Sequence, residues 1–138
     1  MATSVLRLLL DTDVFSAIAR QTSAKAAQRL AELPSGTVGL SVITWAEIAF
    51  GLERRPVSAG LAIRIARLLH ILPVVALQAN VVPRYAQTRT HLEKRGTPIG
   101  PNDLWLSSHA LAEDMTVVTG NVREYARVPG LRVENWLA

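Results

Sequence analysis

Val5-Leu6-Arg7-Leu8-Leu9-Leu10 is a near-continuous apolar run, and the acidic Asp11 follows it directly. Runs of this length and composition are typical of a strand that is buried on both faces of a parallel sheet. Ligands of open α/β sheets bind outside the carboxyl ends of the strands, so a charge in this position is more informative than one in a loop. Asp11 is therefore the first candidate site residue.

The rest of the chain alternates between strand and helix patterns. Further strands are expected at residues 38–41, 72–77, 115–119 and 131–134, and helices at 13–19, 22–33, 41 or 44 to 55, 58–70, 78–95, 101–113 and 121–126. Pro73 favours an edge position for its strand, and Pro83 is expected to bend or break the long helix. Such alternation predicts an α/β fold with a parallel sheet covered on both faces, in one domain spanning residues 1–138.

Composition limits the classes of function. The 138 residues include 15 Lys+Arg against 11 Asp+Glu, giving a net charge of +4, which weakly favours polyanionic partners such as nucleic acid. The chain has no cysteine, which excludes disulfides, thiolate zinc sites and cysteine nucleophiles and is compatible with a reducing cytoplasm. The sequence shows neither a secretory signal nor a membrane span.

Other oxygen-bearing side chains stand near the starts of predicted helices, as Asp11 does. They are Glu47, Asp103, Asn121 and Glu124. In a parallel sheet these positions can converge on one edge, where clustered carboxylates repel one another unless a cation is present. Oxygen-only ligands suit Mg²⁺, with Mn²⁺ as an alternative, and such ions activate water for attack on a phosphodiester.

Each of these residues, taken alone, has an ordinary structural explanation. Asp13 is expected to cap the helix that follows it, Glu47 has capping-box spacing with Thr44, and Asp103 is favoured in a first turn by the helix dipole. Thr12 is expected to bond a backbone group. The hypothesis of a site depends on all these residues falling at comparable places in one small chain.

Together these stretches resemble a PIN domain, in particular the VapC family of toxin ribonucleases. The resemblance starts at residues 8–14, continues through Thr44-Trp45-Ala46-Glu47-Ile48, and is strongest from Ile99-Gly100-Pro101-Asn102-Asp103 to Val118-Thr119-Gly120-Asn121-Val122-Arg123-Glu124-Tyr125. The closing residues 127–136 are also similar to the family's tail, so nearly the whole chain is covered.

The resemblance implies a three-layer fold with a parallel five-stranded sheet flanked by helices, and a Mg²⁺-dependent endoribonuclease site. It assigns the family's acidic positions to Asp11, Glu47 and Asp103. The fourth position is open, because Asn121 stands where many PIN domains have Asp and Glu124 is the nearest carboxylate. One or two metal ions are therefore compatible with the sequence.

The resemblance also implies partners: an RNA substrate, a second copy of the chain in a homodimer, and a cognate VapB-like antitoxin, all in the cytoplasm. Arg123 and Arg127 are the best candidates for contacts to RNA phosphates. Asn121 in place of an acid leaves one alternative open, a catalytically weak PIN-like module that binds RNA or a partner. A phosphatase or phosphotransfer receiver is disfavoured, because neither Lys25 nor Lys94 follows a predicted strand.

Overall fold

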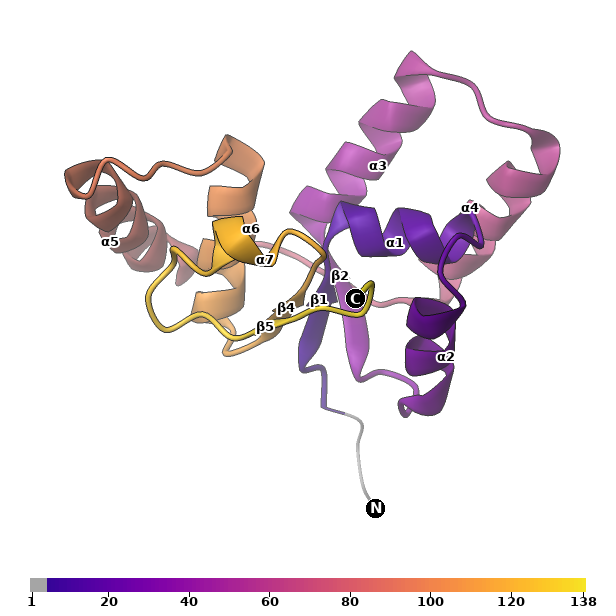
Figure 1. Cartoon of the computed structure of the whole chain (residues 1–138), viewed down its shortest axis with the longest axis horizontal. Helices are drawn as coiled ribbons and strands as arrows, with labels where there is room; N and C mark the ends of the chain where they lie inside the picture. The colour runs from indigo at the N-terminus through magenta and orange to yellow at the C-terminus, as the bar shows by residue number, and fades with distance from the viewer. Residues whose placement is uncertain (1–4) are drawn as a thin grey trace.

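The computed structural model describes residues 5–138 and contains one parallel sheet with helices on both faces (Figure 1). In chain order the elements are β1 (Leu8–Leu10), α1 (Thr12–Ala19), α2 (Ala24–Glu32), β2 (Val38–Ser41), α3 (Val42–Arg54), α4 (Ala59–Ile71), β3 (Val74–Val75), α5 (Val81–Lys94), α6 (Pro101–Ala112), β4 (Thr116–Val118), α7 (Val122–Tyr125) and β5 (Val133–Glu134). The expected five-stranded, three-layer α/β fold is confirmed.

The strand order β3-β2-β1-β4-β5 places β1 at the centre of the sheet. Leu8 pairs with Val38 on one side and with Thr116 on the other, and all pairings are parallel. Full burial of β1 explains its continuous apolar run, since both faces of a central parallel strand are covered. Pro73 directly precedes β3, and β3 lies at the edge of the sheet, as predicted.

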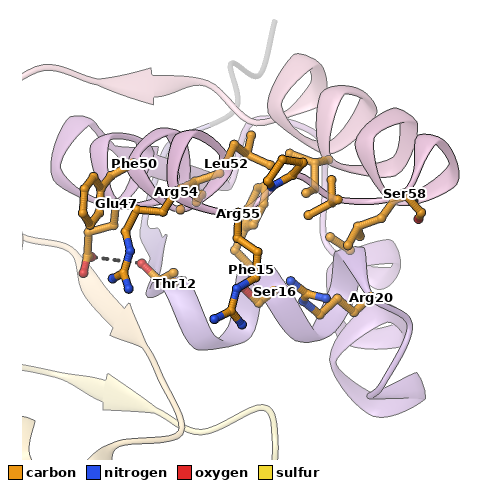
Figure 2. Close-up of a pocket in the computed structure, with 17 residues that line it drawn as sticks. Thr12, Phe15, Ser16, Arg20, Glu47, Phe50, Leu52, Arg54, Arg55 and Ser58 are labelled. Carbon is orange, nitrogen blue, oxygen red and sulfur yellow. Dashed lines mark hydrogen bonds between the residues drawn. The ribbon is translucent and has the colours of Figure 1, made fainter.

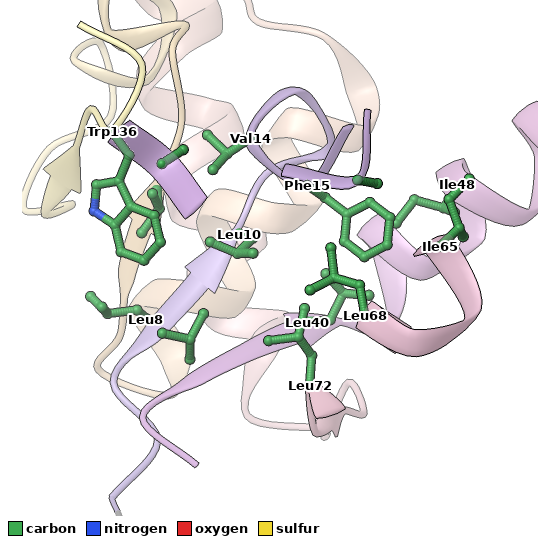
Figure 3. Close-up of a cluster of buried hydrophobic side chains, with 14 of the residues drawn as sticks. Leu8, Leu10, Val14, Phe15, Leu40, Ile48, Ile65, Leu68, Leu72 and Trp136 are labelled. Atoms are coloured by element: carbon green, nitrogen blue, oxygen red, sulfur yellow. The ribbon is translucent and has the colours of Figure 1, made fainter. Parts of the chain in front are cut away.

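Two hydrophobic clusters hold the layers together. Leu8 and Leu10 point to one face and pack against α1, α2, α3 and α4, with Phe15 near the centre of that cluster (Figure 3). Leu9 points to the other face and packs with α6 and with Tyr125 of α7. This alternation within one three-residue strand ties the helices of both layers to the same central element.

Several local predictions were wrong. The strand expected from residue 5 is regular only from Leu8, because Val5 is exposed outside the sheet. Pro83 does not bend a helix: α5 begins at Val81, so Pro83 lies in the first turn, where a missing N–H costs no helical hydrogen bond.

No helix within residues 5–138 combines the length and apolarity that a membrane span requires.

The structure decides between the caps that the sequence left open, and it contradicts the capping box. Asp11, not Asp13, caps α1, because its side chain accepts a hydrogen bond from the Thr12 amide. Ser41 caps α3, so Thr44 is buried within the helix and forms no capping box with Glu47. Ser41 Oγ also lies 2.8 Å from His109 Nδ1, which joins the start of α3 to α6. Burial lowers the pKa of His109 and favours a neutral ring.

Candidate active site

Asp11 sits at the carboxyl end of the central strand with both carboxylate oxygens engaged. Oδ1 accepts a hydrogen bond from the Thr12 amide at 2.8 Å, and Oδ2 accepts one from Thr119 Oγ1 at 2.8 Å. Thr119 follows β4, the strand next to β1, so the sheet itself brings the two residues together. Burial raises the pKa of Asp11 although both hydrogen bonds favour its charged form.

Asp103 approaches Asp11 from the first turn of α6. Its Oδ1 accepts a hydrogen bond of 2.9 Å from the hydroxyl of Tyr125. Burial and the negative charges of Asp11 and Asp103 raise the pKa of Tyr125, so both carboxylates lie close to its hydroxyl. Burial, reinforced by the neighbouring carboxyl groups of Glu124 and Asp11, raises the pKa of Asp103 to about 7. A pKa shift of this kind, caused by burial and like charges, is typical of functional sites.

Glu124 is the third carboxylate at this edge. Its Oε1 accepts a hydrogen bond from the Gly100 amide at 2.8 Å, and its Oε2 accepts one from the side-chain amide of Asn121. Burial alone would raise the pKa of Glu124, but the bonds from Gly100, Asp103 and Asn121 outweigh it, so the pKa is lowered. The two shifts run in opposite directions, so Glu124 loses its proton at a lower pH than Asp103 does.

Glu47 reaches the same region through a different contact. Its Oε1 accepts a hydrogen bond of 3.0 Å from the hydroxyl of Thr12, the residue after Asp11. Thr12 was expected to bond a backbone group, and that prediction was wrong. The carboxylate of Glu47 thus lies beside the site, one residue removed from Asp11 rather than in contact with it.

The predicted phosphate contacts lie on the outside of this edge. Arg123 is exposed on α7. Arg127 is also exposed, donates a 3.0 Å hydrogen bond to the Pro98 carbonyl and lowers the pKa of Glu124 through its charge. Asp13 supports the site indirectly. Its Oδ2 accepts a 2.9 Å hydrogen bond from the Gly120 amide and so anchors the loop that follows β4.

Two contributors were missed in the sequence, Thr119 and Tyr125. Thr119 bonds Asp11, and Tyr125 bonds Asp103. Their signal was weak, because a Thr at a strand end and a Tyr in a short helix are ordinary residues. The useful clue was position: both belong to the segment at 118–125 that ends β4 and carries Asn121 and Glu124.

The donors suit a hard divalent cation, since all of them are carboxylate oxygens. Within residues 5–138, however, no three acidic or histidine side chains are already grouped in metal-binding geometry. Mg²⁺ commonly uses only one or two protein carboxylates and keeps several waters. The pair Asp11 and Asp103, both raised in pKa chiefly by burial, fits an ion held in that way.

A cavity of about 660 Å³ extends from the Thr12–Glu47 contact between α1, α3 and α4 (Figure 2). Its floor is apolar and includes Phe15 and Ile48, whereas Arg20, Arg54 and Arg55 supply positive charge to its walls. Of the site carboxylates, Glu47 lies on the lining of this cavity, so the cavity opens beside the site at the Thr12–Glu47 contact.

A parallel sheet with acidic residues at its carboxyl edge is the architecture of a PIN domain, and the PIN-domain family model matches residues 8–131. The chain belongs to this family. Within the family it groups with the VapC ribonucleases: Ribonuclease VapC2 of Rickettsia felis is 35% identical over 102 residues, covering 74% of this chain and 76% of that protein. The tRNA(fMet)-specific endonuclease VapC of Shigella flexneri is 29% identical, covering 96% of this chain and 99% of that protein.

Solved structures give the same grouping. The VapBC2 complex of Rickettsia felis bound to a promoter DNA fragment aligns with a TM-score of 0.87 and 30% identity, covering 95% of this chain and 99% of that chain. VapBC-1 of nontypeable Haemophilus influenzae aligns with a TM-score of 0.85 and 28% identity, covering 96% and 100% of the two chains.

Proposed function

We propose that this protein is the toxin of a VapBC-type toxin–antitoxin system and an endoribonuclease that depends on Mg²⁺ or Mn²⁺. The observation that carries the proposal is that Asp11 and Asp103, 92 positions apart, come close together at the carboxyl edge of the sheet, where Tyr125 bonds Asp103 and the charge of Asp11 acts on both. The names of the similar proteins, ribonucleases and endonucleases, support the same chemistry.

Asp11 and Asp103 are the residues that hold the cation, with Glu124 beside Asp103. When bound there, Mg²⁺ or Mn²⁺ supplies positive charge to the scissile phosphate and lowers the pKa of a coordinated water. Glu47, held by the Thr12 hydroxyl at the entrance of the groove, is placed to accept a proton from an attacking water. Asn121 is engaged with Glu124 and acts by orienting that carboxylate.

The substrate is inferred from the surroundings of the site, and the partners from the similar proteins. Arg123 and Arg127 lie exposed next to the carboxylates and position the RNA backbone through its phosphates. The similar structures are VapBC complexes, which supports a VapB-like antitoxin as partner. A homodimer is the expected form of the toxin. An enzyme that cuts cellular RNA acts in the cytoplasm.

The products of cleavage test this function. Purified protein incubated with a structured RNA and Mg²⁺ is expected to cut it internally and to leave ends without a 2′,3′-cyclic phosphate. That product forms only when the ribose 2′-hydroxyl attacks, whereas the proposed nucleophile is water. End-group analysis of the fragments by mass spectrometry measures the difference.

Two outcomes of this experiment contradict the proposal. Cyclic phosphate ends would show that the ribose, not water, is the nucleophile. Metal-independent binding of intact RNA without any cutting would instead support a PIN-like binding module, the reading favoured by Asn121 at the fourth acidic position.

A further inference from the structure

Tyr125 has a core side chain whose only polar atom faces the candidate metal site. Its ring is fully buried and packs with Leu9, Leu106 and Ala110 in the cluster beneath the sheet. That apolar environment accommodates a phenyl ring equally well. The hydroxyl is therefore not needed for packing, and its role must come from what it touches.

The hydroxyl bonds one of the two aspartates that are proposed to bind metal and lies close to the other. It donates to Asp103 Oδ1 at 2.9 Å, and the negative charge of Asp11 also acts on it. Asp103 Oδ2 is turned the other way, toward Gly100 and Glu124, where it lies 3.4 Å from the position of an added Cβ on Gly100. One oxygen of Asp103 is thus fixed by Tyr125 while the other faces Glu124, the neighbouring carboxylate of the site.

A fixed donor to a carboxylate has a specific consequence. It restricts the rotation of Asp103, so that the remaining lone pairs of that carboxylate keep a constant direction. The buried ring anchors the hydroxyl to the sheet and to α6, the two elements that carry Asp11 and Asp103. The donor therefore cannot move away without disturbing the core.

We propose that Tyr125 is a positioning residue of the metal site: its hydroxyl holds Asp103 in the orientation in which Asp103 and Asp11 together bind a divalent cation. This inference rests on the proposed function, because it concerns the cation of that same site. Partners that orient metal ligands typically contribute about 10- to 100-fold to metal affinity or activity.

The test is the variant Tyr125→Phe, which removes the hydroxyl and keeps the ring. Isothermal titration of the intact protein with Mg²⁺ at pH 8 is expected to show binding weakened by about tenfold. In RNA cleavage, the Mg²⁺ concentration for half-maximal rate is expected to rise by the same factor, and the rate is expected to recover at saturating Mg²⁺. A merely structural role would lower the rate at every Mg²⁺ concentration.

Tyr85→Phe is the matched control, because Tyr85 is the other tyrosine of the chain and its hydroxyl contacts Arg89, away from the site. It is expected to bind Mg²⁺ as the wild type does. Suppose that the wild type binds Mg²⁺ and that Asp11→Asn abolishes this binding. Unchanged Mg²⁺ affinity in Tyr125→Phe would then overturn the role of Tyr125 and leave the metal site standing. Absence of Asp11-dependent Mg²⁺ binding in the wild type would overturn the metal site and the inference together.

Discussion

Replacing Asp103 by Asn is expected to lower the rate of RNA cleavage by at least about 10³-fold. The charge stabilisation that a bound divalent ion provides amounts to several kcal/mol, and each 1.36 kcal/mol corresponds to about tenfold in rate. Asn removes the charge that attracts the ion while keeping the shape of the side chain. Initial rates with a labelled RNA at fixed Mg²⁺ measure the loss.

The same substitution is expected to stabilise the metal-free protein at pH 8. The pKa of Asp103 is about 7 in the folded protein against an ordinary value of 3.8, so the folded state prefers the protonated form. The stability contributed by this group is fully present below pH 3.8 and is lost as pH rises through about 7. Asn stays neutral at every pH and can still accept the hydrogen bond from Tyr125.

The expected gain in the free energy of unfolding is about 1–3 kcal/mol at pH 8 in EDTA, after a discount for partial exposure of the side chain. Near pH 4 the gain should vanish. Urea denaturation at both pH values measures it. Cleavage that persists in Asp103→Asn, or a loss of stability at pH 8, would contradict the assignment of Asp103.

Asp114→Asn is the control for this prediction. Asp114 is highly exposed, pairs with Arg132 on the surface and has a φ of 55°, a conformation that Asn tolerates. The substitution is expected to leave cleavage unchanged and to shift the free energy of unfolding by no more than about 0.5 kcal/mol.

Removal of the divalent ion is expected to have an effect as large as that of Asp103→Asn. Excess EDTA should reduce cleavage by at least about 10³-fold, and added Mg²⁺ or Mn²⁺ should restore it. Because a proton competes with the cation for Asp103, half-maximal activity at pH 6 should require about tenfold more Mg²⁺ than at pH 8.

Rates measured across a Mg²⁺ titration at the two pH values test this dependence. EDTA that has been saturated with Mg²⁺ beforehand serves as the control and should not inhibit. Cleavage that continues in free EDTA would show that Asp11 and Asp103 serve a purpose other than binding a cation.

The sheet and one end of the site could be predicted from the sequence because they depend on local patterns. The apolar run before Asp11 identified the central strand, and Pro73 identified an edge. The parallel arrangement then required Asp11 and the segment after β4 to meet, since adjacent parallel strands end on the same side of a sheet. Asp103 joined them because its helix, α6, leads into β4.

The contacts between side chains could not be predicted in this way. Tyr125 bonds Asp103 across 22 positions and Thr12 bonds Glu47 across 35, and no local pattern specifies such pairs. The choice of Asp11 over Asp13 as cap also depends on where β1 stops. The pairing with β4 extends to Leu10, and this strand pairing, not either aspartate, sets the end of β1.

The most direct measurement of the proposed metal site is anomalous X-ray diffraction at the manganese edge, from crystals of the protein soaked in Mn²⁺. The structure predicts an anomalous peak between the carboxylates of Asp11 and Asp103, absent from crystals of the Asp103→Asn variant. A peak bound to other residues, or none at a Mn²⁺ concentration that supports cleavage, would contradict the claim that these two aspartates hold the catalytic cation.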